Sequence, residues 1–154
     1  MTNPLFHFVL ADEDATTNLA SLIAPHLKAG DTLLLEGAIG AGKSAFARAL
    51  IRARLGRMED VPSPTFTLVQ TYEDASADIW HCDLYRLTHP DEALELGLDE
   101  AFETAICLIE WPDRLGDIAP KTALRLAFSA EDHAHKLTIS GPPPWDSRLR
   151  GLHD

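Results

Sequence analysis

The sequence predicts a single α/β domain with a mixed, mainly parallel central sheet flanked by helices. The chain has 154 residues, a length that suits one domain with a real hydrophobic core. Continuous apolar runs, typical of buried strands, alternate with segments of helical periodicity through the middle of the chain. The later part is richer in strand-like segments, which favours a mixed sheet over a purely parallel one.

The first third of the chain predicts the order strand, helix, strand, helix. The opening strand is expected over Phe6–Leu10, and a helix with an acidic first turn follows it. Thr32–Leu35 has the pattern of a strand that is buried on both faces. The next helix is expected from about Lys43 to Leu55, closed by Gly56.

Shorter elements are expected beyond this helix. A loop with two prolines leads into an antiparallel pair of strands, Phe66–Tyr72 and Ile79–Leu84. Asp91–Phe102 predicts a short acidic helix or a helix pair interrupted at Gly97. The remaining predicted strands are Ala105–Glu110, Ala123–Phe128 and Lys136–Ile139.

The proline run Gly141–Pro144 sets the expected limit of the domain. Proline continues neither a helix nor a central strand, so we expect the fold to end near Ser140. The predicted division is one folded domain over residues 1–140 and a proline-rich C-terminal tail over 141–154. Cys82 and Cys107 have no zinc spacing and are expected to be small buried thiols.

Composition limits the classes of function. An apolar fraction of 45% with 24% charged residues describes a folded globular chain, not a disordered one. The net charge of −11 argues against a broad basic face that grips nucleic acid, while a local basic patch stays open. No apolar run approaches the roughly 20 residues of a membrane span, and no signal peptide is recognisable, so a cytoplasmic protein is expected.

The strongest motif is Gly-Ala-Ile-Gly-Ala-Gly-Lys-Ser at 37–44, which matches G-x-x-x-x-G-K-[ST] between a predicted strand and a helix. Glycines let successive backbone N–H groups point at phosphate oxygens, and the helix N-terminus adds positive potential. Lys43 is expected to reach the β- and γ-phosphates, and the Ser44 hydroxyl to bind Mg²⁺. The motif therefore predicts a P-loop NTPase-like domain. The residues expected at the nucleotide are Gly37, Ala38, Ile39, Gly40, Ala41, Gly42, Lys43, Ser44 and Ala45.

The nucleotide and its metal need further groups. The chain has no Asn-Lys-x-Asp tetrapeptide, the usual reader of guanine, so ATP is favoured over GTP. Phosphoryl chemistry also needs a carboxylate at the metal. Glu110 ends an apolar strand, where an open α/β sheet places its ligand, and Asp83 lies in a second strand-like segment. Each of these acids has a structural alternative as a salt-bridge or loop carboxylate, and Arg86 offers Asp83 such a partner.

Five segments in order and spacing carry a resemblance to a known family. Taken together, they resemble the bacterial TsaE family, formerly called YjeE, from about Ala15 to about Ile139. The blocks Ser-Pro-Thr-Phe-Thr-Leu-Val and Asp-Leu-Tyr-Arg-Leu are specific to that family, unlike a P-loop alone. The segments are Gly37–Ser44, Ser63–Val69, His81–Leu87, Glu95–Glu100 and Ile109–Pro112.

The resemblance implies an ATPase that supports synthesis of N6-threonylcarbamoyladenosine. This modified base lies beside the anticodon in tRNAs that read codons beginning with A. In that family the protein acts on a TsaB–TsaD complex and does not perform the transfer itself, so tRNA is met only through that complex. ATP binding and hydrolysis reset the complex between turnovers. Activity of the chain alone is expected to be weak and dependent on its partner.

The resemblance also implies roles for single residues. Ser44 and Glu110 are the expected metal-site residues, with Asp83 near the metal and its waters. Thr65 is expected to sense the γ-phosphate, with a plain turn hydroxyl as the alternative. Trp111 belongs to the functional motif and to the expected nucleotide site, with a core aromatic as the alternative. His81 is expected to be an ordinary strand histidine.

Three positions depart from the family pattern. Ala38 stands where an acid is common, and Ala45 where a hydroxyl residue is common, which puts a contact to the α-phosphate in doubt. An arginine that the family often has before the last strand is replaced locally by His135 and Lys136.

Two charged segments have open interpretations. Asp91–Thr104 has six acidic residues and no basic one, which fits a solvated helix face or a docking surface for a basic patch. Four arginines lie on or just after the predicted P-loop helix and are candidates to meet tRNA or an acidic partner. They are Arg48, Arg52, Arg54 and Arg57.

Two other functions compete with a partner-directed ATPase. A small-molecule kinase on the same fold needs an acceptor pocket and often an arginine-rich lid. No lid-like, arginine-rich insertion is recognisable here, which weakens that alternative. A nucleotide-binding module that never hydrolyses is the third hypothesis.

Overall fold

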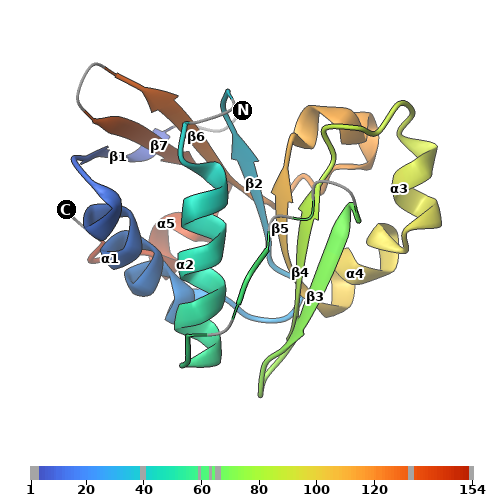
Figure 1. The fold of residues 1–154 in the computed structure, drawn as a ribbon, viewed down its shortest axis with the longest axis horizontal. Coiled ribbons are helices and arrows are strands. Elements are labelled where there is room, and N and C mark those ends of the chain that lie inside the picture. The colour runs from blue at the N-terminus through green and yellow to red at the C-terminus, as the bar shows by residue number, and fades with distance from the viewer. Residues whose placement is uncertain are drawn as a thin grey trace.

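The computed structural model describes residues 4–38, 41–58, 60–62, 64, 67–131 and 134–152. Within these residues a seven-stranded sheet crosses the middle of the molecule in the order β1-β7-β6-β2-β5-β4-β3 (Figure 1). The four central strands run parallel, and the strands outside them pair antiparallel. The predicted mixed α/β fold is therefore confirmed. The strands are β1 (Pro4–Leu10), β2 (Thr32–Glu36), β3 (Val69–Glu73), β4 (Asp78–Asp83), β5 (Ile106–Glu110), β6 (Leu124–Ala130) and β7 (His135–Ser140).

The two strands at the centre owe their place to unbroken apolar sequence. Every residue of β5 is buried, and β2 is buried from Thr32 to Leu35. Such strands are stable only where helices cover both faces of the sheet. Alternate residues of β2 point to opposite sides, so Leu33 and Leu35 join one apolar core and Leu34 joins the other.

Helices cover the two faces as this pattern requires. α1 (Glu13–Ile23) and α2 (Lys43–Leu55) pack together on one face, and α3 (Asp91–Glu95) and α4 (Leu98–Thr104) lie on the other (Figure 1). The α1 helix continues into a 3₁₀ turn, η1 (Ala24–His26).

The helix ends follow the expected chemistry. Asp12 caps α1 by accepting a hydrogen bond from the Ala15 backbone N–H at 2.9 Å. Gly56 ends α2 with φ of 69°. Gly97 separates α3 from α4 with φ of 85°, which confirms the predicted interruption of the acidic segment.

The segment after Ser140 differs from the expectation of a fold that ends there. It forms a short helix, α5 (Trp145–Arg148), and Trp145, Leu149 and Leu152 belong to the main core. The Trp145 indole N–H donates to the Thr122 carbonyl at 2.8 Å. The prolines do end the β7 ladder, but apolar residues beyond them return to the sheet because burial stabilises them.

Two further observations bear on the sequence predictions. Both cysteines are buried and free, and burial raises the pKa of Cys107 to about 12 and that of Cys82 well above its usual range. Among the helices of the described residues, none combines the length and the apolar character needed to cross a membrane.

Candidate nucleotide site

The carboxyl ends of three parallel strands meet where α2 begins. Glu36 ends β2, Glu110 ends β5 and Asp83 ends β4. Asp83 lies directly beside Glu110 in the parallel register, and Leu35 lies beside Glu110 on its other side. The loop from β2 then delivers α2 to the same edge of the sheet (Figure 1). The topology thus brings together the acids that the sequence proposed and the motif residues at the start of α2.

A buried polar chain links α2 to the sheet through Glu110. The Ser44 hydroxyl donates to Glu110 Oε1 at 3.0 Å, and His81 Nε2 lies 2.7 Å from Glu110 Oε2. Glu110 and His81 are 2% and 1% exposed, so both sit in a medium where such contacts are strong. His81 is thus a direct partner of the candidate metal-site acid and not the plain strand histidine of the prediction.

Lys43 carries a buried polar group without a hydrogen-bond partner, as does His81 at Nδ1. In Lys43 this group is Nζ, and the side chain is buried. The ammonium lies 3.5 Å from the centroid of the Trp111 ring, a cation–π contact that replaces only part of its lost hydration. Burial lowers the pKa of Lys43, although the nearby charges of Glu110, Asp83 and Asp113 act in the opposite direction.

Trp111 is held over Lys43 by strained backbone and by a second ring. Its φ of 60° and ψ of 54° lie in the left-handed region, which a non-glycine residue adopts at a cost. The Tyr85 ring packs against it with centroids 5.0 Å apart. The 3₁₀ segment η2 (Pro112–Ile118) follows directly and turns the chain away. The Trp111 ring therefore covers the Lys43 ammonium and also packs against the apolar core that contains Leu34.

Asp83 is fixed by main-chain contacts at the end of β4. It is 7% exposed, and its Oδ1 accepts a hydrogen bond from the Tyr85 N–H at 3.0 Å. The Asp83 N–H donates to the Leu68 carbonyl at 2.9 Å. Leu68 has φ of 68°, so strained backbone occurs on both sides of the acidic pair, at residues 68 and 111.

Two glycines of the loop fit against the β6–β7 hairpin. A Cβ on Gly37 would lie 2.5 Å from the Phe128 carbonyl oxygen, and Gly37 has φ of 138°. A Cβ on Gly42 would lie 3.1 Å from His135 Nδ1, and Gly42 has φ of 109°. Position 37 thus requires glycine for the packing of the loop as well as for its conformation, whereas position 42 requires it chiefly for its conformation, because the His135 side chain could move aside.

A cavity of about 490 Å³ opens beside the start of α2. Its walls come from the end of β1, the start of α1, the first turn of α2 and the β6–β7 hairpin. Asp12, Thr16 and His135 supply polar groups to it, and Gly42 connects it to the phosphate loop. Sequence reasoning did not identify this wall, because residues far apart along the chain form it.

The oxygen ligands present at the phosphate loop suit a Mg²⁺ ion that is also bound by phosphate. One hydroxyl, on Ser44, and one carboxylate, on Glu110, lie within hydrogen-bond distance of each other at the phosphate loop. Mg²⁺ usually takes one or two protein oxygens and completes its shell with phosphates and water. No group of three or more His, Cys, Asp or Glu side chains within the described part of the chain forms an all-protein metal cage. The partnerless Lys43 ammonium beside these donors fits a site for a phosphorylated ligand.

Some predicted residues lie outside this geometry. Thr65, Ile39 and Gly40 are outside the described residues. Ala38 is exposed, and Ala45 lines the cavity described above. His81 could have been found from its spacing, because residues two apart on a strand share a face and Asp83 follows it by two.

One residue from each of the two charged segments makes contacts that stabilise the fold locally. Arg54 donates to Asp74 at 2.6 Å and to the carbonyls of Ala24 and Leu27 at 2.9 and 3.0 Å, so it serves the fold. Glu92 accepts from the Thr88 hydroxyl at 2.6 Å and from two backbone N–H groups, contacts that lower its pKa. These two members of the predicted docking surfaces therefore have local structural roles.

The fold and the loop define a P-loop α/β protein whose acids lie at the carboxyl edge of the sheet. Residues 10–138 match the family described as "Threonylcarbamoyl adenosine biosynthesis protein TsaE". The chain belongs to the TsaE family.

Curated relatives and a solved structure agree with this membership. The Rickettsia felis protein named tRNA threonylcarbamoyladenosine biosynthesis protein TsaE is 45% identical over 84% of this chain and 75% of its own. The protein of the same name from Bacillus subtilis is 36% identical over 82% of this chain and 80% of its own. The crystal structure of Bacillus subtilis YdiB superposes with a TM-score of 0.80 at 29% identity, covering 97% of this chain and 93% of that one.

Proposed function

We propose that the chain binds ATP with Mg²⁺ at the start of α2 and hydrolyses it to support threonylcarbamoyladenosine formation in tRNA. It acts on a TsaB–TsaD complex and meets tRNA through that complex, without performing the transfer itself. Membership of the TsaE family supports the pathway. The observation that carries the nucleotide role is the buried Lys43 ammonium, which has no hydrogen-bond partner and follows a glycine-rich loop.

Each residue of the site has a task in this proposal. Lys43 exchanges the Trp111 ring for β- and γ-phosphate oxygens, which are better partners for an ammonium than a ring face. Ser44 and Glu110 hold the metal, and His81 keeps the Glu110 carboxylate in place. When bound, Mg²⁺ neutralises charge on the phosphates. Asp83 orients water at the same edge, and the cavity of about 490 Å³ receives the base and ribose.

The deciding experiment measures ADP production from Mg²⁺-ATP without any added acceptor. The purified chain is assayed alone and with a TsaB–TsaD pair. We expect slow hydrolysis alone and a clear stimulation by the pair. Hydrolysis that does not respond to the pair would contradict the partner role and favour a small-molecule kinase, which a screen of phosphate acceptors would then test.

A variant of Glu110 tests the chemistry of the site. Glu110→Gln keeps the size and the Ser44 contact but removes the charge at the metal. We expect ATP binding to persist while ADP production falls on the order of 100-fold. Normal hydrolysis by this variant would move the acid role to Asp83, for which Asp83→Asn is the matched substitution.

A further inference from the structure

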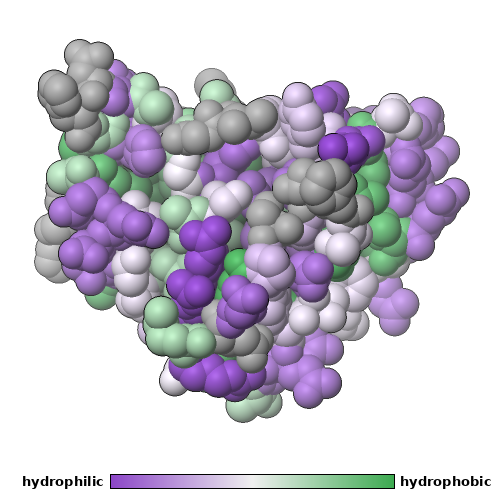
Figure 2. Space-filling view, viewed as in Figure 1, coloured by the Kyte–Doolittle hydropathy of each residue, from purple (hydrophilic) through white to green (hydrophobic). Residues whose placement is uncertain are grey.

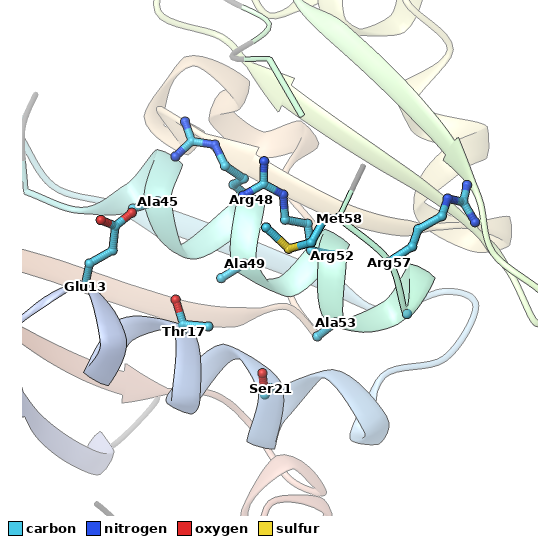
Figure 3. A pocket seen from close by; sticks show the side chains of 11 residues that line it. Glu13, Thr17, Ser21, Ala45, Arg48, Ala49, Arg52, Ala53, Arg57 and Met58 are labelled. Atoms are coloured by element: carbon cyan, nitrogen blue, oxygen red, sulfur yellow. The ribbon is translucent and has the colours of Figure 1, made fainter. Parts of the chain in front are cut away.

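A second hollow, of about 390 Å³, runs between α1 and α2 on the surface of the molecule (Figure 3). We call it the α1–α2 groove. Its floor carries small side chains at helical spacing, and arginines from α2 and the following turn stand along its α2 side. The lining residues are Glu13, Thr17, Ser21, Ala45, Arg48, Ala49, Arg52, Ala53, Gly56, Arg57 and Met58.

The floor of the groove lets another backbone approach closely. Ala45, Ala49 and Ala53 follow one another at four-residue intervals on α2, and Thr17 and Ser21 face them from α1 (Figure 3). The alanine stripe covers nine residues, or roughly 12 Å of helix. This length matches two to three turns of a third helix lying against the pair. The Met58 side chain, which is 82% exposed, offers such a helix a further apolar contact.

The rim of the groove selects a negatively charged occupant. Arg48, Arg52 and Arg57 all line it, whereas the whole chain has only 13 basic residues against 24 acidic ones. Figure 2 shows strongly hydrophilic residues gathered over α2 beside a paler strip, in the same view as Figure 1. Guanidinium groups match carboxylates in a two-pronged geometry, which favours Asp and Glu on the facing segment.

Three features favour an acidic protein segment over a nucleic-acid backbone. Among the described residues that line the groove, none is aromatic, so no surface for base stacking is offered. Glu13 at one end repels any anion, but a protein segment can place its acidic residues against the arginines and away from Glu13, which a continuous run of phosphates cannot do. The chain's net charge of −11 also opposes a polyanion at long range, and a short protein helix meets less of that field.

The groove also adjoins the proposed nucleotide site. Glu13 and Ala45 line both the α1–α2 groove and the cavity beside the phosphate loop. A segment seated in the groove would therefore touch the same helix turn as the nucleotide. Because the groove and the nucleotide cavity share this wall, the occupant of the groove is best identified with the partner on which the proposed ATPase acts.

We propose that the α1–α2 groove is the docking site for an acidic helical segment of the protein partner on which the chain acts. The inference rests on the proposed function for the identity of that partner. Acidic side chains of the segment pair with Arg48, Arg52 and Arg57, and small or apolar ones face the alanine stripe.

Binding of the TsaB–TsaD pair to three variants tests the groove by isothermal titration calorimetry. Arg52→Glu with Arg57→Glu reverses the rim charge, and Ala53→Trp fills the exposed floor. Lys121→Glu with Arg150→Glu changes the net charge by the same amount at exposed positions outside the groove. We expect at least tenfold weaker binding for the first two variants, less than twofold change for the control, and unchanged Mg²⁺-ATP affinity in all three.

The outcomes separate this inference from the proposed function. If the wild-type chain does not bind the pair, the proposed partner and the docking site both fail. If the pair binds and the groove variants bind it as the wild type does, the docking site alone is overturned. If the rim reversal weakens binding of isolated tRNA and leaves the pair unaffected, the groove serves a phosphate backbone and the proposal is wrong.

A crosslink identifies the occupant directly. Ala53→Cys adds an exposed thiol to a chain whose own two cysteines are buried, so benzophenone-maleimide attaches at the groove. We expect mass spectrometry of the irradiated complex to find a helical partner segment with a surplus of Asp and Glu. Crosslinking to a segment without that surplus overturns the charge argument.

Discussion

Each end of α2 carries a cationic side chain with little exposure to solvent, but only one of the two is hydrogen-bonded. At its last turn, Arg54 donates to Asp74, to Ser76 and to two backbone carbonyls, and tightly joins α2 to η1 and to the β3–β4 turn. At its first turn, Lys43 is more deeply buried, has no hydrogen-bond partner and lies on the Trp111 ring. The comparison teaches that a satisfied buried charge maintains the fold, whereas an unsatisfied one indicates a ligand.

The largest expected effect is a loss of nucleotide affinity when the charge at the first turn of α2 is removed. Lys43→Met keeps the length of the side chain and removes the charge that the phosphates need. We expect Mg²⁺-ATP affinity to fall at least about 100-fold, since a charged hydrogen-bonded contact is lost. Calorimetric titration measures this, with circular dichroism to show that the variant is folded. Unchanged affinity would refute the assignment of the phosphate loop.

The matched change at the other end acts on stability. Arg54→Met removes the cation that pairs with Asp74 and the donor to two backbone carbonyls, and leaves the Asp74 carboxylate only its contacts with Ala75 and Ser76. We expect the free energy of unfolding to fall by about 3 kcal/mol, because a mostly buried ion pair is broken. Urea denaturation measures the loss, and Mg²⁺-ATP affinity should stay within about threefold of the wild type at a temperature where the variant is folded. A loss of Mg²⁺-ATP affinity without a loss of stability would show that Arg54 serves the ligand and not the fold.

A smaller effect is expected at His81, which positions Glu110 from the neighbouring strand. His81→Leu removes the contact to Glu110 Oε2 and keeps an apolar side chain in the buried space. We expect ADP production to fall about tenfold and the Mg²⁺ concentration for half-maximal rate to rise, as for other partners of metal-site carboxylates. His81→Gln, which retains an N–H donor, should recover part of both. Equal defects in the two variants would assign His81 to packing alone.

Lys43→Met should also raise the stability of the ligand-free protein. Burial lowers the pKa of Lys43, so the folded chain holds this proton less tightly than the unfolded chain does. The buried charge therefore costs stability at neutral pH, and the cost disappears as the pH rises through the lowered pKa towards 10.5. We expect the variant to gain about 1 kcal/mol at pH 7 and less at pH 10. A gain that grows with pH would contradict this sign.

The smallest expected effect isolates the backbone strain at Trp111. Trp111 has φ of 60°, so Trp111→Gly should be more stable than Trp111→Ala by about 1 kcal/mol. At Ala53, which is helical and lies in the last turn of α2, the glycine variant should be the less stable one by about the same amount. Thermal unfolding of both pairs gives the two differences. The same sign at both positions would show that Trp111 is not strained.

The sequence predicted the parts of this molecule that depend on local pattern. The α2 helix runs over Lys43–Leu55 as expected, because the glycines at both ends determine its limits. The β3–β4 pair and the break at Gly97 also follow from turn residues and periodicity. Glu110 was identified because it ends an apolar run, and the structure brings its carboxylate within hydrogen-bond distance of Ser44.

What the sequence did not predict depends on contacts between distant segments. Spacing could place His81 on the same strand face as Asp83, but its contact with Glu110 requires the register of β4 on β5, which no local pattern contains. Among the four arginines of 48–57, only the folded chain distinguishes Arg54, which meets Asp74, from those that line the α1–α2 groove. The return of Trp145 to the core likewise depends on the space that α1 and the sheet leave.

The close fit of Gly37 against the Phe128 carbonyl has a consequence for how this chain can evolve. A side chain at position 37 would collide with backbone before any ligand arrives. In a mutational scan selected only for soluble expression, position 37 should therefore already be intolerant, whereas position 43 should accept many residues. The same scan selected for growth would deplete both. Two positions of one motif, the first and the seventh, would thus be constrained for different reasons, one by the architecture of the fold and one by its activity.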